Sequence, residues 1–384
     1  MRQRIYLDHA ATTPTHPEVV EAMIPCMVNI FGNPSSVHFF GRQARHEVDD
    51  ARALIAKSIN AKENEIIFTS GGTEADNTAL HGVAMAYKGK GNHIITTAVE
   101  HHAILHTCQY LEKEGFEITY LPVNEYGEVS IGDLKRAIKD TTILVSIMYG
   151  NNEVGTIQPI KEIGELLSDT TILFHSDAVQ AYGIETIDVK ELHLDLMSVS
   201  AHKINGPKGI GFLYVKNDVK LAPRQFGGEQ ERKRRAGTEN VAGIVGFKEA
   251  VRLAQSTLTE KAEKYVEFKQ CMIDVFQREE IDFFVNSKGA KDLLPHVFNV
   301  SFPGTNVESM LINLDLAGIA ASSGSACTAG SIDPSHVLVA MFGNNSNRIS
   351  SSIRFSFGLG NTMEEIEQAA LEISKIVKRV TSRR

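Results

Sequence analysis

Short apolar runs alternate with amphipathic stretches through most of the chain. The runs that predict β-strands are 65–69, 93–97, 118–121, 143–147, 171–174, 196–199 and 211–215. Between them apolar residues recur at helical spacing, as Ala44, Val48, Ala51 and Ile55 do. Such alternation predicts an α/β fold in which helices flank a mostly parallel, mixed sheet on both faces.

The pattern changes in the last third of the chain. A long, charged helical stretch at about 239–280 is expected to connect two domains. Shorter elements follow it: strands at 282–285 and 297–302, a helix near 306–315, and a C-terminal helix at 363–380. A length of 384 residues also suits two domains. We therefore predict a large domain over 15–260 and a smaller α/β domain formed by 1–14 and 261–384.

Composition excludes several classes of function. The net charge of −8 makes the chain a poor bulk binder of nucleic acid, and no direct nucleic-acid contact is expected. The basic run 232–235 lies beside Glu229 and Glu231, so a solvated or salt-bridged face is the preferred interpretation. The apolar run 142–149 is far shorter than the ~20 residues of a membrane-spanning helix. The N-terminus lacks the apolar core of a signal peptide, so we expect a cytoplasmic protein.

The four cysteines are too widely spaced for a disulfide framework or a zinc cluster. Cys26, Cys108 and Cys271 lie in helical, apolar-patterned stretches and are expected to be small buried side chains. Cys327 differs, because it lies among glycine, serine and alanine, where packing does not explain a cysteine. His102 and His106 share a helix face but have no third ligand in the pattern, so no metal site is expected.

A glycine-rich break follows the apolar strand at 65–69. Gly71, Gly72 and Thr73 come directly before a helical stretch. Glycines let the backbone approach an anion closely, and a helix N-terminus offers unpaired N–H groups and a positive dipole end. A phosphate is the natural guest, although a plain strand–helix turn has the same pattern.

Two further segments carry candidate chemistry. Asp177 follows an apolar strand, where a carboxylate could keep a pyridine nitrogen protonated or simply cap a helix. Lys203 follows the strand at 196–199 and precedes the glycine- and proline-rich break 205–209. A partly desolvated lysine suits a Schiff base, although a lysine at a surface turn stays an alternative. Ser200 and His202 are placed to hold a phosphate or a ring oxygen.

The order of phosphate cradle, ring-nitrogen acid and reactive lysine resembles that of class V, fold type I enzymes that use pyridoxal 5'-phosphate (PLP). The chain is most similar to the NifS/IscS-type cysteine desulfurases within that class. The resemblance spans nearly the whole sequence and is carried by the segments 6–14, 31–36, 71–74, 100–102, 151–155, 177–180, 200–209, 323–327 and 352–356. It implies a large PLP-binding domain and a small domain with the catalytic cysteine loop.

The resemblance also implies a role for each site residue. Lys203 would carry the cofactor as a Schiff base, His101 would stack on its ring and transfer protons, and Cys327 would receive the sulfur. The other cofactor contacts implied are Gly72, Thr73, Asn152, Asp177, Gln180, Ser200, His202 and, from the partner subunit of a homodimer, Thr238. Arg354 and Asn152 would clamp the substrate carboxylate, with support from Asn33.

The activity implied is conversion of L-cysteine to L-alanine, with the sulfur kept as a persulfide on Cys327. A sulfur-acceptor protein, such as an iron–sulfur scaffold or a tRNA-thiolating enzyme, would then take it. The glycine- and serine-rich segment 322–331 predicts a mobile carrier for that sulfur. The alternatives are a selenocysteine lyase, another class V aminotransferase, and a scaffold that retains PLP for structure alone.

Overall fold

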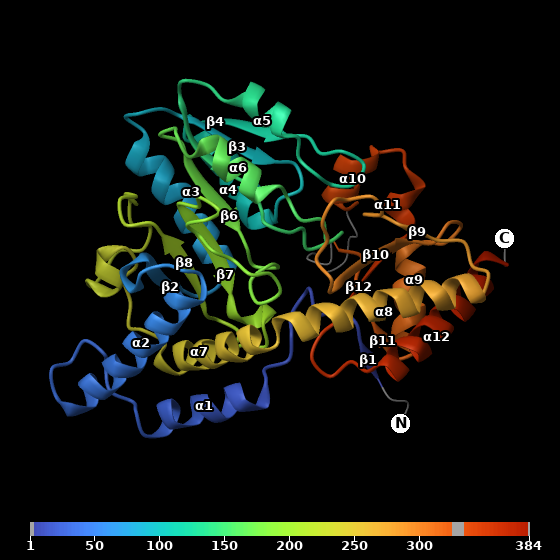
Figure 1. Ribbon diagram of the computed structural model, residues 1–384, viewed down its shortest axis with the longest axis horizontal. Coiled ribbons are helices and arrows are strands. Elements are labelled where there is room, and N and C mark those ends of the chain that lie inside the picture. The colour runs from blue at the N-terminus through green and yellow to red at the C-terminus, as the bar shows by residue number, and fades with distance from the viewer. Residues whose placement is uncertain (1–3, 325–333, 383–384) are drawn as a thin grey trace.

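The computed structural model describes residues 4–324 and 334–382. A seven-stranded sheet forms the centre of the larger part, in the order β2-β8-β7-β6-β5-β3-β4 (Figure 1). Its strands are β2 (Ile66–Thr69), β3 (His93–Thr97), β4 (Glu117–Leu121), β5 (Thr142–Ser146), β6 (Leu173–Asp177), β7 (Leu196–Ser200) and β8 (Gly211–Val215). β8 runs opposite to the other six strands, so its pairings with β2 and β7 are antiparallel and the remaining pairings are parallel. The mixed, mostly parallel sheet predicted from the sequence is confirmed.

Helices cover both faces of this sheet because successive strand residues point to opposite sides. On one face, Ile67, Ile94 and Leu213 pack with α3 (Gly72–Tyr87) and α4 (His102–Lys113). On the other face, Phe68 and Phe212 belong to a larger apolar cluster. That cluster also holds residues of α1 (Pro17–Val28), α2 (Phe39–Ser58), α5 (Ile131–Ala137), α6 (Ile160–Leu167) and α7 (Val241–Ser256).

One predicted strand begins later than expected. The apolar pattern gave 171–174, whereas β6 runs over Leu173–Asp177. The Thr170 hydroxyl donates to the Leu167 carbonyl at 2.8 Å and accepts the Ile172 N–H at 3.2 Å, which holds this stretch in a turn. Asp177, which was expected beyond the end of the strand, is therefore its last residue.

The helical stretch predicted over about 239–280 is present but is interrupted once. Two helices, α7 and α8 (Leu258–Arg278), meet at Thr257, where φ is −126°. The Thr257 N–H and hydroxyl donate to the Ala254 and Leu253 carbonyls, which ends α7. The β-branched threonine can satisfy the helix end with its own side chain. α7 packs against α1 and α2, and α8 packs against α12 (Met363–Thr381), so the pair extends from one part of the molecule to the other (Figure 1).

The smaller part has an antiparallel sheet of order β12-β10-β9, with β9 (Phe284–Val285), β10 (Val297–Ser301) and β12 (Ser352–Ser356). A parallel pair joins β1 (Ile5–Tyr6) to β11 (Ile319–Ala320), so the N-terminus packs with C-terminal segments. The remaining helices are α9 (Val307–Leu316), α10 (His336–Phe342) and α11 (Asn347–Ser351). Its apolar cluster includes Ile5 and Leu7 beside Phe355 and Phe357. The exact domain boundaries near residues 14 and 260 stay a prediction. Among the described residues, no helix is both long and apolar enough to cross a membrane.

Candidate active site

A cavity of about 270 Å³ lies at the carboxyl edge of the large sheet, where ligands gather in open α/β folds. Segments after β2, β3, β5, β6 and β7 reach it, together with the N-terminal segment and β12. Its lining residues are Ala10, Ala11, Gly72, Thr73, Asp76, His101, Met148, Gly150, Asn152, Asp177, Val179, Gln180, Ser200, His202, Lys203, Gly324 and Arg354.

Most of the site residues predicted from the sequence meet in this cavity. Asn33 and Thr238 do not line it; both are exposed elsewhere on the same chain. Cys327 and most of its segment lie outside the described residues. The roles predicted for these three residues stay predictions.

Two glycines lie at the end of the cavity where the sequence predicts a phosphate. Gly71 has φ +148°, and Gly72 begins α3. A Cβ on Gly72 would come within 2.7 Å of Val179 Cγ2, so a side chain does not fit there. The positive end of the α3 dipole and its unpaired N–H groups therefore face the cavity, with Ser200 and His202 beside them.

Lys203 is positioned by a one-turn helix, η2 (Ala201–Lys203), that follows β7 directly. Its Nζ donates to the carbonyl oxygens of Ala10 and, at 2.8 Å, of Ala11. Gln180 Nε2 donates to the same Ala10 carbonyl at 2.9 Å. The N-terminal segment thus orients the Lys203 amine and the Gln180 amide toward the same carbonyl oxygen, that of Ala10. No local pattern predicts these contacts, because the partners lie 170 to 193 positions apart in the chain.

A buried acidic pair closes the floor of the cavity. Asp177 Oδ1 accepts the Val179 N–H at 2.9 Å, and burial raises the pKa of this carboxyl. Asp76 is also buried, and its pKa is raised first by burial and then by the Asp177 charge. The His175 ring lies 3.8 Å from Asp76 and is hydrogen-bonded to Ser146 and Ser198; burial lowers its pKa to about 3. A cationic group bound next to Asp177 would stabilise the charged carboxylate and so lower the pKa of Asp177 again.

Asp76 was missed by the sequence argument. It lies in α3 between Ala75 and Ala79, at a position that a helix of this pattern normally fills with an apolar side chain. A carboxyl at a core position is the signal that could have revealed it.

His101 is held in one orientation and one protonation state. Its Nδ1 accepts the Ala103 N–H at 3.1 Å and caps α4. Burial and the nearby Lys203 lower its pKa to about 4. The ring is therefore neutral near pH 7, with the proton on Nε2, and it presents a flat face and one donor to the cavity.

Arg354 is almost fully buried, and its guanidinium is anchored at two points. Nη2 donates to Asp8 Oδ1 at 2.8 Å and Nη1 to the Asn152 carbonyl at 3.0 Å. Its Nε has no hydrogen-bond partner in the described part of the chain. The backbone of Arg354 also pairs with Ser322. A carboxylate entering the cavity would find a fixed, buried cation. Asp8, which no motif argument singled out, orients that cation.

Three comparisons with known proteins agree with this geometry. Residues 5–369 match the Aminotransferase class-V family. The chain belongs to that family. A Bacillus subtilis (strain 168) protein that carries the name IscS 1 is 61% identical over 380 residues, covering 99% of this chain and 100% of its own length. The "Cysteine desulfurase IscS" of Clostridium botulinum (strain Hall / ATCC 3502 / NCTC 13319 / Type A) is 51% identical over 98% of this chain and 95% of its own. A solved "NIFS-LIKE PROTEIN" has a TM-score of 0.91 at 35% identity, covering 98% of this chain and 100% of that chain.

Enzymes of this family use pyridoxal phosphate, and the residues present here fit that group. The cradle at Gly72 and Thr73 lies at the N-terminus of α3, and Gly72 has no side chain there that could obstruct a phosphate. Asp177 is a buried carboxyl that a ring nitrogen can partner, and Lys203 is an amine within the same cavity. His101 offers a flat neutral ring. Gln180, Ser200 and His202 complete the set of donors.

Glu100 precedes His101 and is fully buried. Its Oε1 accepts from the Thr97 hydroxyl at 2.8 Å and the Met148 N–H at 3.0 Å, whereas Oε2 has no hydrogen-bond partner within 4–324 and 334–382. Burial raises the pKa of Glu100 to about 8. The folded protein therefore keeps a proton that the unfolded chain has lost above its ordinary pKa of 4.5.

Glu100 is expected to make stability depend on pH with a defined sign. Its contribution is full below about pH 4.5 and is lost as the pH rises toward about 8, by at most about 1.4 kcal/mol per pH unit. The Glu100→Gln variant has no ionisable group at this position. The difference between its thermal unfolding midpoint and that of the wild type should therefore grow from about pH 5 to about pH 9. Thermal denaturation at several pH values measures this, with the exposed Glu114→Gln as control. A difference that stays flat for Glu100→Gln would contradict the assignment.

Proposed function

We propose that this protein is a cysteine desulfurase that converts L-cysteine to L-alanine and keeps the sulfur as a persulfide on Cys327. The observation that carries the proposal is the meeting of Lys203, Asp177, His101 and Arg354 in one cavity at the sheet edge. The family match and the names of the similar proteins support the same activity.

Each side chain of the cavity has a separate role in the proposed reaction. When bound, pyridoxal phosphate supplies an aldehyde for the substrate amine and a ring that stores the electrons released at the α-carbon. Arg354 binds the substrate carboxylate, and Asn152 lies beside it. Lys203 Nζ then takes the proton from the substrate α-carbon. It can afterwards donate this proton to a different atom of the reacting molecule. Asp177 holds a proton on the ring nitrogen, which a buried carboxylate favours strongly.

The sulfur step needs a nucleophile that the described residues do not include. The Cys327 thiolate would attack the substrate sulfur, forming an S–S bond as the C–S bond breaks, with the electron pair going to the substrate side. In balance, L-cysteine and the Cys327 thiol give L-alanine and a Cys327 persulfide. No external oxidant or reductant enters.

The direct test is to incubate the PLP-loaded protein with L-cysteine in a single turnover and to quantify both products. One L-alanine and one protein persulfide per subunit are expected. A keto acid in place of alanine would indicate an aminotransferase, and a preference for selenocysteine over cysteine would indicate a selenocysteine lyase. Absence of any turnover would leave a scaffold that keeps PLP for structure.

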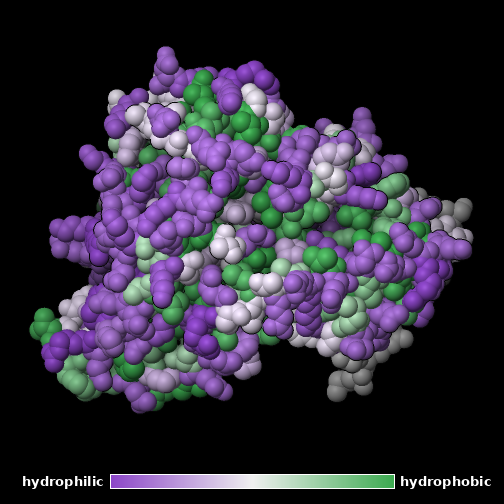
Figure 2. Space-filling model, in the orientation of Figure 1, coloured by the Kyte–Doolittle hydropathy of each residue, from purple (hydrophilic) through white to green (hydrophobic). Residues whose placement is uncertain are grey.

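A homodimer is part of this proposal, and an exposed apolar surface supports it. The surface lies on α1 and on the segment that enters α2, at the lower left of Figures 1 and 2. It consists of Val20, Ile24, Met27, Val28, Phe31, Val37, Phe39 and Phe40. So many large apolar side chains close together usually mark a protein interface. We propose that a second copy covers this surface and that its Thr238 reaches the phosphate cradle.

The sulfur acceptor is proposed to be another protein, either an iron–sulfur scaffold or a tRNA-thiolating enzyme in the cytoplasm. The acceptor must take sulfur from a protein persulfide, so it needs a thiol that can approach Cys327. Capture from a cytoplasmic extract with the persulfide-loaded protein, followed by transfer of labelled sulfur to the purified candidate, tests this.

Arg354→Lys is expected to raise KM for L-cysteine by about tenfold or more while PLP affinity changes little. A lysine keeps the charge but loses the fork that grips a carboxylate at two points, a difference of about 1.5–3 kcal/mol for charged hydrogen bonds. Steady-state kinetics and PLP titration measure the two effects. Unchanged KM together with lost PLP binding would show that Arg354 serves the cofactor instead.

A further inference from the structure

We propose that His296 is a positioning residue for Lys203. Its ring donates from Nε2 to the Gln180 amide, and this contact fixes the direction in which the amide donates to the carbonyl oxygen that also holds the Lys203 amine. The inference rests on the proposed function, in which Lys203 is the reactive amine. His296 lies in none of the sequence motifs described above.

His296 lies immediately before β10 and is almost fully buried. Its ring reaches the large part of the molecule, where Nε2 lies 3.1 Å from Gln180 Oε1. Its carbonyl oxygen accepts the N–H of Phe357, in the small part, at 2.9 Å. Its Nδ1 has no hydrogen-bond partner in residues 4–324 and 334–382. Gln180 is therefore the polar partner of the ring in this part of the chain.

The Ala10 carbonyl decides the direction of each hydrogen bond in this chain, because a carbonyl oxygen can only accept. Gln180 Nε2 donates to it at 2.9 Å, so the other end of the amide, Oε1, faces His296. An amide oxygen also only accepts, so the proton of the ring must be on Nε2. Lys203 Nζ donates to the same Ala10 oxygen and, at 2.8 Å, to that of Ala11. His296 and Lys203 are thus connected through one amide and one carbonyl group.

The surroundings of His296 agree with this direction. Burial, and then the nearby positive charges of Lys269 and Lys203, lower the pKa of His296 to about 3. Lys269 is held in place, since its Nζ donates to the Leu294 carbonyl at 2.7 Å. A neutral ring carries one proton. Among the described residues Nδ1 has no acceptor for that proton, whereas Nε2 has the Gln180 oxygen.

Both ends of this chain of hydrogen bonds are held by the end of β12, the strand that carries Arg354. Ser356 Oγ accepts the Ala10 N–H at 2.8 Å, and the next residue, Phe357, donates to the His296 carbonyl. Arg354 lies two positions before Ser356, and its guanidinium is the fixed cation of the cavity. His296 therefore helps to set the position of the Lys203 amine relative to the cation that would bind the substrate carboxylate.

Loss of the Nε2 donor is expected to change the ionisation of Lys203. Without that donor the Gln180 amide can turn, and the Ala10 carbonyl loses its second donor. The carbonyl then accepts more strongly from the Lys203 ammonium, so the charged form of the amine is stabilised. The amine should lose its proton at higher pH and be less reactive near pH 7. Within the described residues, the other ionisable groups that line the cavity stay unchanged: Asp76, His101, Asp177, His202 and Arg354.

The test compares His296→Leu with His296→Gln. Leucine has no donor, whereas glutamine can place its Nε2 close to where the histidine Nε2 lies. An amine-reactive anhydride labels Lys203 in the full-length, PLP-free protein, and peptide mass spectrometry follows the labelling against pH, with exposed Lys208 as the internal reference. The pH of half-maximal labelling is expected to rise by about half a unit or more in His296→Leu and to return toward the wild type in His296→Gln.

Steady-state kinetics of the PLP-loaded variants separate positioning from binding. His296→Leu is expected to lower kcat for alanine release by about threefold or more, with little change in KM for L-cysteine, because Arg354 keeps its anchors. His93→Leu is the matched control. His93 is also a buried histidine, hydrogen-bonded to Thr142 and Thr119, but it begins β3 and so lies at the opposite end of the sheet from the cavity. His93→Leu should change neither the labelling nor kcat.

Two further measurements hold even if His296→Leu folds poorly. Gln180→Leu removes the middle of the chain of hydrogen bonds. It should shift the labelling of Lys203 as His296→Leu does, and the double variant should add nothing further. In wild-type protein with 15N-labelled histidine, NMR should show a neutral His296 ring with its proton on Nε2 from about pH 5 to about pH 9. The signals are assigned by their loss in His296→Gln.

Several results would overturn the proposal. They are a wild-type labelling curve in His296→Leu, a His296→Gln variant as impaired as His296→Leu, a shift of equal size in His93→Leu, and a ring proton on Nδ1. Additive effects of His296→Leu and Gln180→Leu would also overturn it, since the two residues would then act separately. A wild-type protein that releases no alanine from L-cysteine would refute the proposed function instead, and the labelling and the NMR would still decide whether His296 acts on Lys203.

Discussion

Replacing Lys203 with alanine is expected to lower alanine release from L-cysteine by about a thousandfold or more. The side chain is the amine that the N-terminal carbonyls of Ala10 and Ala11 aim into the cavity. No other lysine lines that cavity within the described residues. The purified wild-type protein should be yellow with a pH-sensitive absorption band, and Lys203→Ala should lose that pH sensitivity. Absorption spectra and an alanine assay measure both effects.

A neighbouring lysine provides the control for this prediction. Lys208 lies five positions further along the same segment and is exposed. Lys208→Ala should retain both the band and the activity. A wild-type spectrum and normal turnover in Lys203→Ala would show that another amine carries the cofactor.

Cys327→Ser is expected to bind PLP and L-cysteine normally, yet to release less than about a hundredth of the wild-type alanine and to carry no transferable sulfur. A serine hydroxyl is a far weaker nucleophile toward sulfur than a thiolate, because it is hardly ionised near pH 7. The prediction depends on the chemistry of the side chain alone, since Cys327 lies outside the described residues. Mass spectrometry for the persulfide and a single-turnover alanine assay measure it.

The remaining cysteines are matched controls. Cys26 and Cys108 are buried, as the sequence predicts, and Cys271 is partly buried. Burial raises the pKa of all three thiols, so each is a poor nucleophile. Cys271→Ser should retain full sulfur transfer. Equal losses in Cys271→Ser and Cys327→Ser would mean that thiol removal disturbs the fold rather than the reaction.

The sequence alone determined the class of the fold and most of the cavity. Strand and helix patterns are local, because burial of one face imposes a period of two or of 3.6 residues on the chain. The strands of the large sheet could be placed to within a few residues for that reason. Asp177 ends one of those strands and Lys203 lies a few residues beyond another, and the carboxyl ends of parallel strands meet at one edge. Their meeting therefore followed from the local pattern.

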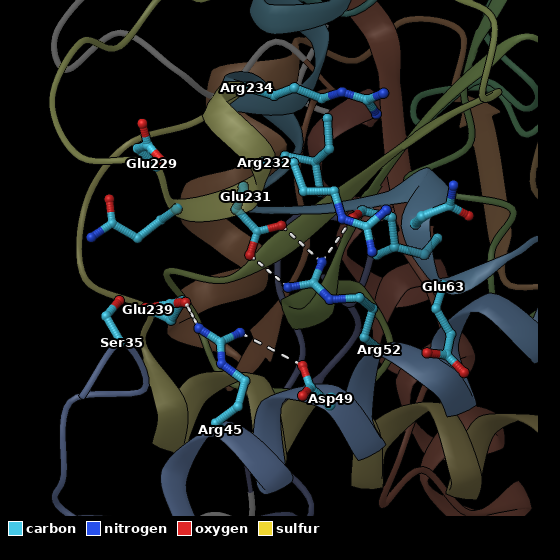
Figure 3. Close-up of a pocket in the computed structure, with 14 residues that line it drawn as sticks. Ser35, Arg45, Asp49, Arg52, Glu63, Glu229, Glu231, Arg232, Arg234 and Glu239 are labelled. Carbon is cyan, nitrogen blue, oxygen red and sulfur yellow. Dashed lines mark hydrogen bonds and ion pairs between the residues drawn. The ribbon is translucent and has the colours of Figure 1, made fainter. Parts of the chain in front are cut away.

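Only the tertiary structure decided which distant residues support the site. Arg354 meets Asp8 across 346 positions, and Lys203 meets Ala11 across 192. Contacts of this kind depend on how the N-terminal segment packs between the seven-stranded sheet and the three-stranded sheet. Such packing produces no periodic pattern in the sequence. The turn at Thr257 and the late start of β6 had the same origin, since side-chain hydrogen bonds overrode the apolar pattern. Arg45 likewise links Pro34 with Glu239 (Figure 3 shows the pair with Glu239), and such a contact between separate segments depends on the folded geometry rather than on local periodicity.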